Sequence, residues 1–464
     1  MIERLVIFGA TGDLTARYLL PGIAALQAAG QLPAGFRLTG AGREPWDSGR
    51  YRNWASDQLA RHASGVSADA RRAVAAGSVY QQADVTDPRS VAAAVAGNGP
   101  VAAYLALPPA VFPAAVTALR DSRLPDGSRV VLEKPFGEDL ASAVELNRLL
   151  AGFMTEEAVF RVDHFLAMTT VQNMLGSRLA NRVLEPIWNA AHIAEVDIVW
   201  EESLALEGRA GYYDGVGALK DMIQNHLLQL LCLVAMEPPV SLGERDLRDR
   251  KLDVLRSVRP LTADDVRRRT RRARYAAGRI GGREVPAYAG EQGVDPGHRT
   301  ETFAEVELEL DNWRWPGTTF RLRAAKALGR DRKEVAVRFR AVPHLPMLGE
   351  VTPNVLRFGL EPESVRLELF GAGGQPGTLA PLTLGAELPP PDLPAYGQLI
   401  RTVLNQDASL SIRGDEAEES WRVVEPVLDG WSKDLVPLAE YPAGSLGPGR
   451  WEDPAGPAAP LVPE

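Results

Sequence analysis

Cysteine is nearly absent from this sequence of 464 residues, in which Cys232 stands alone. A single cysteine cannot form a disulfide bond within the chain, so nothing here is typical of a protein built for an oxidising compartment, and we expect the cytoplasm. Apolar runs are short as well. None approaches the roughly 18 residues that a membrane-spanning helix needs, and the segment after Met1 has no secretory cleavage site. We therefore expect neither a membrane span nor a secretory signal.

An excess of positive charge is also lacking. The chain has 51 basic and 60 acidic residues, which gives a formal net charge of −9. This balance offers no general attraction to nucleic acid or to an anionic membrane, so an anionic ligand must be held by a local site. Lysine is scarce, and a GC-rich genome that favours arginine explains this best. The alternative is that chemistry demands a compact cation where lysine is kept, and the six lysines are Lys134, Lys220, Lys251, Lys326, Lys333 and Lys433.

The composition that is present, 45% hydrophobic and 24% charged, is that of an ordinary globular protein of two or three domains. The N-terminal segment has the order strand, glycine turn, helix that is typical of a dinucleotide-binding unit, over residues 4–8, 9–14 and 19–26. Further strands are predicted over residues 36–40, 101–107 and 129–133. Because strands alternate with alanine-rich helices, we predict a parallel sheet covered on both faces.

The pattern changes after about residue 165. Long helices are predicted over residues 170–182 and 219–236, followed by alternating strands such as 302–310 and 334–340. We therefore divide the chain into an α/β coenzyme domain over residues 1–165 and an α+β domain over residues 166–464. The arginine-rich run over residues 267–272 fits a solvated face in or beside a helix better than an anion site. The tail over residues 447–464 is predicted to be irregular.

Gly9 and Gly12 form a shortened version of the dinucleotide fingerprint. Glycine lets the backbone approach a pyrophosphate at a helix N-terminus, whose amides and dipole favour negative charge. A glycine turn that binds nothing is the alternative. After the second predicted strand we find no acidic residue of the kind that holds the ribose of NAD, and Arg43 stands there instead. An arginine suits the 2′-phosphate of NADP, although an ordinary surface arginine would look the same.

Asp163 and His226 are candidate partners in acid–base chemistry. They lie in the segments 161–165 and 224–226, and a carboxylate beside an imidazole is able to orient it as a general base. The sequence by itself does not bring the two residues together. A histidine on a helix such as 219–236 more often has a structural role. We predict no metal site.

Ordered motifs run through nearly the whole chain. Those of the first domain are residues 9–14 (GATGDL), 104–109 (YLALPP) and 133–137 (EKPFG). They are followed by residues 161–166 (RVDHFL), 171–173 (VQN), 180–182 (ANR), 186–189 (PIWN), 208–214 (GRAGYYD), 221–229 (DMIQNHLLQ) and 441–448 (YPAGSLGP). Together these segments resemble the glucose-6-phosphate dehydrogenase family. Chance agreement of so many ordered segments is not credible.

The resemblance implies a Rossmann-like coenzyme domain followed by an α+β domain with a large, mainly antiparallel sheet through which subunits pair, as a homodimer or a dimer of dimers. It also implies an enzyme of glucose metabolism. Such an enzyme oxidises a hexopyranose at C1 to the δ-lactone, glucose 6-phosphate in the pentose phosphate pathway, and NADP accepts the hydride.

By position in the motifs, the resemblance also implies roles for single residues. His226 would take the proton from the anomeric hydroxyl, and Asp163 would hold its imidazole. The residues implied in sugar binding are Lys134, His164, Glu202, Asp221 and Lys326. The residues implied in coenzyme binding are Gly9, Thr11, Gly12, Asp13, Leu14, Arg43, Tyr104 and Lys134.

The chain departs from the family's pattern where the sugar phosphate binds. Phe165 replaces a tyrosine, Met168 replaces a lysine, and Asp331 stands where a basic residue is usual. A hydrogen bond to a charged group is worth roughly 1.5–3 kcal/mol, so losing two or three would weaken phosphate binding by about 10²- to 10⁶-fold.

Three hypotheses follow. The first is a glucose-6-phosphate dehydrogenase in which Arg330, Arg332 or Lys333 binds the phosphate. The second keeps the chemistry but acts on a free or differently substituted hexose. The third is an inactive paralogue that serves as a binding partner, and the retention of every implied catalytic residue argues against it.

Overall fold

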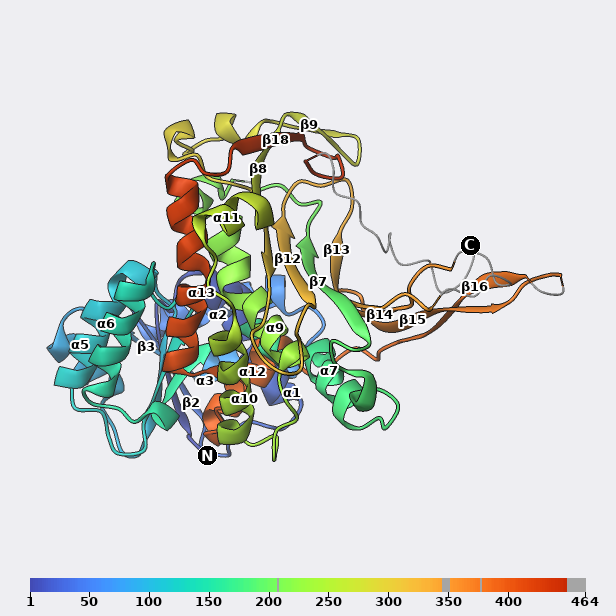
Figure 1. Ribbon diagram of the computed structural model, residues 1–464. Coiled ribbons are helices and arrows are strands. Elements are labelled where there is room, and N and C mark those ends of the chain that lie inside the picture. Colours follow the sequence, from blue (N-terminus) through green and yellow to red (C-terminus); the bar gives the residue numbers. More distant parts are fainter. Residues whose placement is uncertain (207, 344–350, 376–377, 449–464) are drawn as a thin grey trace. The chain divides into compact units, whose positions relative to one another are not determined.

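The computed structural model describes residues 1–206, 208–343, 351–375 and 378–448. The chain forms two compact units (Figure 1). The first comprises residues 1–168, 239–249 and 391–418, and the second comprises residues 169–238, 250–390 and the described part of 419–464. Of the tail predicted to be irregular, residues 449–464 lie outside the described residues. Among the described helices, none combines the length and the apolar character that crossing a membrane requires.

A seven-stranded sheet forms the centre of the first unit, in the order β17-β6-β5-β4-β1-β2-β3. Its strands are β1 (Arg4–Phe8), β2 (Arg37–Gly42), β3 (Ser78–Gln82), β4 (Val101–Leu105), β5 (Arg129–Glu133), β6 (Val159–Val162) and β17 (Ser411–Ile412). All neighbours pair in parallel except β17, which is antiparallel to β6. This is the strand order of a Rossmann fold, and it confirms the predicted α/β class.

Helices cover both faces of this sheet. Val6 and Ile7 of β1 point to opposite faces, and both are buried because both faces are covered. The helices are the π-helix η1 (Thr15–Leu19), α1 (Leu20–Ala28), α2 (Ser48–His62), α3 (Ala68–Gly77), α4 (Pro88–Val95), α5 (Phe112–Asp121), α6 (Leu140–Ala151) and α12 (Ala395–Asn405). One group, α1, α2, α3 and α12, packs together, and α5 packs between α4 and α6 (Figure 1). Asp47, Ser67, Asp87 and Asp139 each cap a helix by accepting a backbone hydrogen bond.

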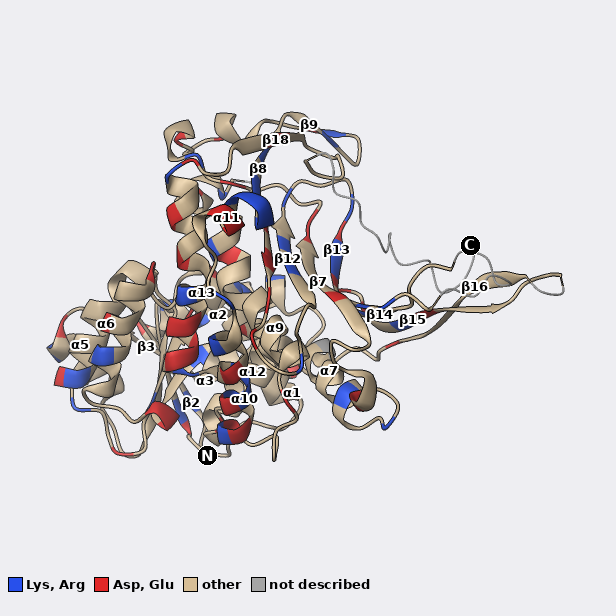
Figure 2. Cartoon of the chain, in the orientation of Figure 1, with Lys and Arg blue, Asp and Glu red and all other residues tan. Residues whose placement is uncertain are grey.

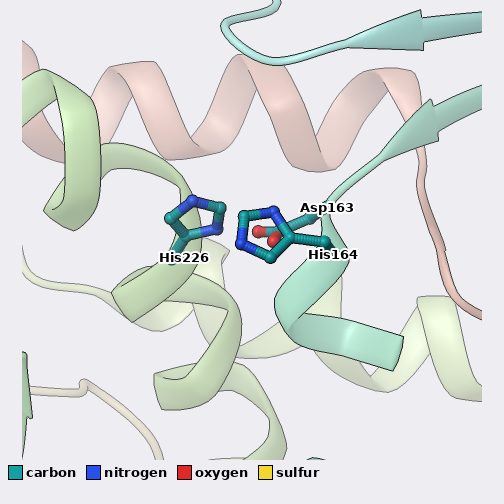
Figure 3. Close-up of side chains that lie close together, drawn as sticks. All are labelled: Asp163, His164 and His226. Carbon is teal, nitrogen blue, oxygen red and sulfur yellow. The ribbon is translucent and has the colours of Figure 1, made fainter. Parts of the chain in front are cut away.

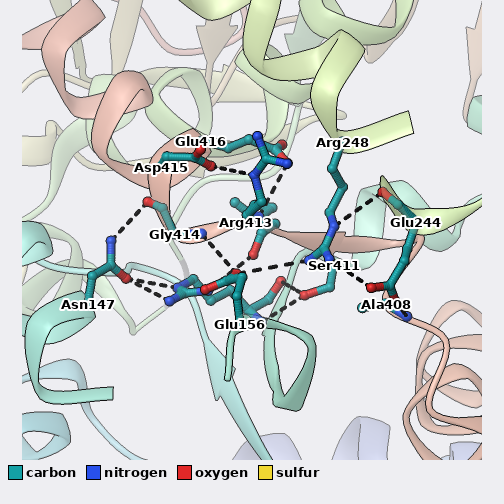
Figure 4. Close-up of polar contacts among 12 residues, drawn as sticks. Asn147, Glu156, Glu244, Arg248, Ala408, Ser411, Arg413, Gly414, Asp415 and Glu416 are labelled. Carbon is teal, nitrogen blue, oxygen red and sulfur yellow. Dashed lines mark hydrogen bonds and ion pairs between the residues drawn. The ribbon is translucent and has the colours of Figure 1, made fainter. Parts of the chain in front are cut away.

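A polar cluster around the buried Arg161 ties β17 to β6 (Figure 4). Arg161 is 1% exposed, forms an ion pair of 2.8 Å with Glu156 and donates to the side-chain oxygen of Asn147 at 2.7 Å. Arg413, which follows β17, forms ion pairs of 2.5 Å with Asp249 and 2.7 Å with Asp415. The cluster therefore supports the strand that directly precedes Asp163.

A nine-stranded sheet forms the centre of the second unit, in the order β16-β15-β14-β13-β7-β12-β11-β8-β18. Its strands are β7 (Ile193–Glu201), β8 (Thr270–Ala276), β11 (Phe303–Leu308), β12 (Thr319–Ala325), β13 (Arg332–Phe339), β14 (Val355–Leu360), β15 (Glu363–Ala372), β16 (Leu379–Glu387) and β18 (Leu438–Pro442). Neighbours are antiparallel except for β7 with β12 and β8 with β18. The predicted mainly antiparallel sheet is confirmed.

The helices of this unit are α7 (Thr169–Leu179), α8 (Ala210–Tyr213), η6 (Leu219–Leu227), α9 (Leu228–Ala235) and α11 (Ala263–Arg269), and a small ribbon is formed by β9 (Gly278–Ile280) and β10 (Arg283–Val285). Two further helices, α10 (Glu244–Ser257) and α13 (Gly414–Ser432), have residues in both units. The helix predicted over residues 219–236 is present as one continuous helical segment, in which the π-helix η6 runs directly into the regular helix α9.

The arginine-rich run over residues 267–272 does not form one solvated face. It spans the end of α11 and the start of β8. Arg268 is exposed and pairs with Asp264 at 3.0 Å, as a solvated residue would. Arg272 is only 6% exposed, and its Nε donates to the carbonyl oxygen of Val436 at 3.0 Å. The change from helix to strand turns these side chains in different directions.

Buried ion pairs cross the central strands of the large sheet, and Figure 2 shows acidic and basic segments along β7, β12 and β13. Arg323 on β12 pairs with Glu201 on β7 at 2.8 Å and with Glu305 on β11 at 2.7 Å. Arg321 pairs with Asp197 at 2.8 Å. These pairs link the strands whose ends carry two of the predicted sugar-binding residues.

Candidate active site

The glycine turn after β1 has a shape that only glycine allows at its first position. Gly9 has a φ of +84°, and an added Cβ would overlap the carbonyl oxygen of Ala106. The amide of Gly12 closes the turn onto the carbonyl of Gly9 at 3.0 Å, and the hydroxyl of Thr15 donates to the same oxygen at 3.1 Å. The turn leads directly into η1 and α1. It therefore places the glycine backbone at the start of a helical segment, where a pyrophosphate is favoured.

A pocket of about 230 Å³ opens at the carboxyl ends of β1 and β2. It is lined by Phe8, Gly9, Thr11, Ala41, Gly42, Arg43, Glu44, Ala83, Val85, Leu107, Pro108 and Val111. Three of the predicted coenzyme residues, Gly9, Thr11 and Arg43, line it together. Its donors, its cation and its apolar walls fit the adenosine end of a dinucleotide. Asp13 is exposed and pairs with Arg17 at 3.6 Å, and Leu14 caps η1.

One prediction about this pocket needs correction. We predict no acidic residue of the kind that holds a ribose after the second strand, but Glu44 lines the pocket next to Arg43. The signal was present, because Glu44 follows Arg43 directly.

The ends of β4 and β5 carry a buried tyrosine and a buried carboxyl group. The hydroxyl of Tyr104, which is 1% exposed, donates to the carboxyl of Glu133 at 2.5 Å. Burial raises the pKa of Glu133 to about 7, against the hydrogen bond from Tyr104 and the charge of Lys134, which lower it. Lys134 follows β5 at once, is half-buried and precedes Pro135 through a cis peptide bond. Glu133 was not predicted as a site residue, since its burial becomes visible only in the fold.

Asp163 and His164 follow β6, one strand further along the same sheet edge (Figure 3). Asp163 is 1% exposed, and its Oδ1 accepts a hydrogen bond from the amide of Phe165 at 2.9 Å. The ring of His164 stacks on Tyr396 of α12, with 5.7 Å between ring centres. The structure thus brings Lys134, Asp163 and His164 to the carboxyl ends of neighbouring parallel strands, where ligands of open α/β sheets bind.

Two predicted sugar-binding residues meet in the second unit. Glu202 follows β7 directly and Lys326 follows β12 directly, and the strands pair in parallel with Ala325 beside Glu201. The ammonium group of Lys326 pairs with the carboxylate of Glu202 at 2.5 Å and lies 5.8 Å from the ring centre of Tyr213. Both side chains are mostly but not fully buried. The pair offers a charged donor and a charged acceptor to a polyhydroxylated ligand.

Asp221 and His226 both lie on the π-helix η6 of the second unit (Figure 3 shows His226). Asp221 is half-buried near the start of this helix, and His226 is 1% exposed near its end. The helix packs against β7, β11 and β12. A π-helix is rare and frequently occurs at functional sites, so its presence under these two residues favours a functional role.

The residues that depart from the phosphate-binding pattern are built into the fold. Phe165 is 3% exposed. Asp331 accepts a hydrogen bond from the amide of Ser203 at 2.5 Å, which holds its pKa below the ordinary value even though burial raises it. These two positions therefore serve packing and backbone support.

The basic residues of the segment 330–333 differ in their partners. Arg332 pairs with Glu334 at 3.0 Å, and Lys333 pairs with Glu361 at 2.6 Å. Arg330 is half-buried and makes no hydrogen bond or ion pair with the described part of the chain. Of the three candidates for a phosphate ligand, Arg330 is the one whose charge no described carboxylate uses.

Comparison with known proteins places this arrangement in one family. The family model "Glucose-6-phosphate dehydrogenase, NAD binding domain" matches residues 6–173, and "Glucose-6-phosphate dehydrogenase, C-terminal domain" matches residues 175–455. A glucose-6-phosphate 1-dehydrogenase of Mycolicibacterium smegmatis is 40% identical, over 96% of this chain and 94% of that protein. One of Rhizobium meliloti is 38% identical with the same coverage.

Solved structures of glucose-6-phosphate dehydrogenases also superpose on this chain over nearly its whole length. A glucose-6-phosphate dehydrogenase in complex with its substrate glucose-6-phosphate superposes with a TM-score of 0.86 at 29% identity, covering 97% of this chain and 96% of that one. The glucose-6-phosphate 1-dehydrogenase of Mycobacterium avium superposes with a TM-score of 0.84 at 32% identity, covering 97% of this chain and 95% of that one.

Proposed function

This chain belongs to the glucose-6-phosphate dehydrogenase family, and we propose that it oxidises glucose 6-phosphate at C1 to 6-phosphoglucono-δ-lactone with NADP⁺. The observation that carries the proposal is the similarity of both halves of the chain to enzymes named for this activity, at 38–40% identity over 96% of its length. The coenzyme pocket supports it, since Arg43 stands where a cation suits a 2′-phosphate.

NADP⁺, when bound, accepts the hydride that leaves C1. Gly9, Gly12 and Thr11 give the pyrophosphate a close approach to the backbone, Asp13 and Leu14 line the same turn, and Arg43 holds the 2′-phosphate. Tyr104 supports this end of the sheet through its hydrogen bond to Glu133. Lys134, directly after β5, serves both the nicotinamide side and the sugar as a compact cation.

His226 acts as the general base. It takes the proton of the C1 hydroxyl while the hydride departs, so that the carbonyl of the lactone forms. Asp163 orients the imidazole and stabilises the imidazolium, and the Phe165 amide that donates to Asp163 keeps this carboxylate in place. His164 binds the sugar side. These roles rest on the positions of the residues in the family's motifs and on the burial of Asp163 and His226.

Glu202 and Asp221 accept hydrogen bonds from the sugar hydroxyls, and Lys326 donates to the sugar while fixing the carboxylate of Glu202. We assign the 6-phosphate to Arg330, because Arg332 and Lys333 are already paired with carboxylates. The loss of the family's tyrosine and lysine at positions 165 and 168 favours a second candidate function. This is the same oxidation of a free or differently substituted hexose. Phe165 has no hydroxyl, and Met168 has no charge for a phosphate.

Steady-state reduction of NADP⁺ with glucose 6-phosphate and with glucose distinguishes the two candidates. We expect kcat/KM to be at least about 100-fold higher for glucose 6-phosphate, and Arg330→Ala to remove about tenfold or more of that preference. Arg267→Ala, an exposed arginine of the same unit, is the matched control and should change neither value. Equal kcat/KM for both sugars would establish the second candidate. No turnover of either sugar by a chain that binds NADP⁺ would indicate the inactive paralogue.

We also propose that residues 1–165 serve as the coenzyme domain and contribute Lys134 and His164 to sugar binding. Residues 166–464 supply the other sugar-binding residues and pair with a second copy through the large sheet, as a homodimer or a dimer of dimers. The single cysteine supports a cytoplasmic location. Light scattering of the purified chain checks the assembly, and a monomer at micromolar concentration would contradict it.

A further inference from the structure

The coenzyme pocket contains two neighbouring residues of opposite charge. Arg43 and Glu44 follow β2 directly, and both line the pocket. The Glu44 side chain folds back over Gly42, where an added Cβ would lie only 2.7 Å from its Oε2. The carboxylate is therefore placed above the end of β2 and not out in solvent.

The structure holds Glu44 in this position. The hydroxyl of Tyr80, on β3, donates to the backbone carbonyl of Glu44 at 3.1 Å and to its Oε2 at 3.2 Å. The amide of Trp46 donates to the same carbonyl at 2.8 Å. The residue is thus fixed on its backbone side and on its side chain, which orients it before any ligand arrives.

Glu44 is a carboxylate at neutral pH. Burial raises its pKa, but hydrogen bonds from its own amide and from the hydroxyls of Thr11 and Tyr80, together with the charge of Arg43, hold the pKa below the ordinary value. A carboxylate has about four acceptor positions, and two hydroxyls use only part of them. The remaining capacity faces a pocket with room for a ribose.

We propose that Glu44 makes this pocket accept NAD⁺ as well as NADP⁺, by taking hydrogen bonds from the 2′- and 3′-hydroxyls of the adenosine ribose. An acidic residue near the end of the second strand is the usual partner of that diol, whereas an arginine there accommodates a 2′-phosphate. This chain has both. The 2′-phosphate of NADP⁺ is attracted by Arg43 but repelled by the like charge of Glu44. The diol of NAD⁺ donates hydrogen bonds to Glu44 without that repulsion.

The inference rests on the proposed coenzyme-dependent function, but its test needs no sugar. Binding of NADP⁺ and of NAD⁺ to the full chain is measured by isothermal titration calorimetry, for the wild type and for Glu44→Gln. Glutamine keeps the size of the side chain and loses its charge. Glu145→Gln removes an equal charge from an exposed position on α6 of the same unit and is the matched control.

We expect the wild type to bind both coenzymes with dissociation constants within about 100-fold of each other. In Glu44→Gln, NAD⁺ should bind about tenfold more weakly, because a charge-assisted hydrogen bond becomes a neutral one. NADP⁺ should bind several-fold more tightly as the like charge disappears. Glu145→Gln should move neither constant.

Two results would overturn the proposal. One is a wild type that binds NADP⁺ but shows no NAD⁺ binding at millimolar concentration. The other is a ratio of the two dissociation constants that Glu44→Gln leaves unchanged. Failure of the sugar oxidation assay with intact binding of both coenzymes would count against the proposed function alone, so the two failures are distinguishable.

Discussion

Removal of Arg323 should destabilise the large sheet far more than removal of its exposed neighbour. Arg323 is 1% exposed and pairs with Glu201 at 2.8 Å and Glu305 at 2.7 Å, both of which are buried. Arg323→Met leaves two carboxylates inside the protein without this cation. Breaking a buried pair from one side costs about 3–5 kcal/mol of unfolding free energy.

Arg271→Met is the matched control, because Arg271 approaches the same Glu305 at 3.6 Å but is 50% exposed. Exposed pairs contribute about 0–1 kcal/mol. Urea unfolding followed by circular dichroism compares the midpoints of the two variants. Since Arg323 and Glu201 hold together the strands that end at Lys326 and Glu202, we also expect a higher KM for the sugar in Arg323→Met and an unchanged one in Arg271→Met.

The pH dependence gives a second test of the same reasoning. Burial raises the pKa of Glu305 even with Arg323 beside it, and loss of that charge raises it further. A folded-state pKa above the unfolded one adds stability at low pH that is lost as the pH rises through the folded pKa. Arg323→Met should therefore lose less stability at pH 5 than at pH 8. Equal losses for Arg323→Met and Arg271→Met at pH 8 would refute the account.

Three further outcomes are expected. His226→Asn should lower kcat by at least about 100-fold, the contribution of a general base, and leave the Kd for NADP⁺ unchanged by calorimetry; near-normal turnover would remove His226 from this role. Glu133, with a folded pKa of about 7 against 4.5, adds stability at low pH that is lost as the pH rises through 7. The unfolding free energy should therefore decline by about 2.5 kcal/mol between pH 5 and pH 8, and Glu133→Gln should flatten this decline in urea unfolding. Gly9→Ala should cost about 1–2 kcal/mol of unfolding free energy and weaken NADP⁺ binding, because its Cβ would overlap Ala106; unchanged binding would argue against a close approach of the coenzyme to this turn.

Sequence patterns predicted the start of the first unit well, because each element there is defined by residues that are adjacent in the sequence. The apolar run of β1, the glycine turn and the helix after it are continuous in sequence, and the structure has them within two residues of their predicted bounds, with η1 in front of α1. The return of residues 391–418 to this unit was not predictable, since the apolar face of α12 does not specify which part of the chain it packs against. The π-helix η6 was missed because its apolar residues also fit a regular helix.

The candidate site shows the same division. Arg43 and the glycine turn were found from spacing, whereas the pairing of Lys326 with Glu202 depends on two strand ends that lie 124 residues apart and become neighbours only when β7 pairs with β12. Family motifs named both residues without their contact. Glu44 was visible in the sequence, but its direction toward the pocket follows from Tyr80 on another strand.

The partners of the basic segment decide which residue is able to replace the missing phosphate ligands. Lys333 pairs with Glu361, whose side chain is 63% exposed, so water would solvate that carboxylate if Lys333 turned to a phosphate, and the exchange would cost little. Arg332 is 7% exposed, and its partner Glu334 is also held by the buried Arg357 at 2.7 Å, so moving Arg332 would break a desolvated cluster. We therefore expect Arg330 to be the first ligand of a phosphate and Lys333 to be the second. Arg332 belongs to the framework of the sheet.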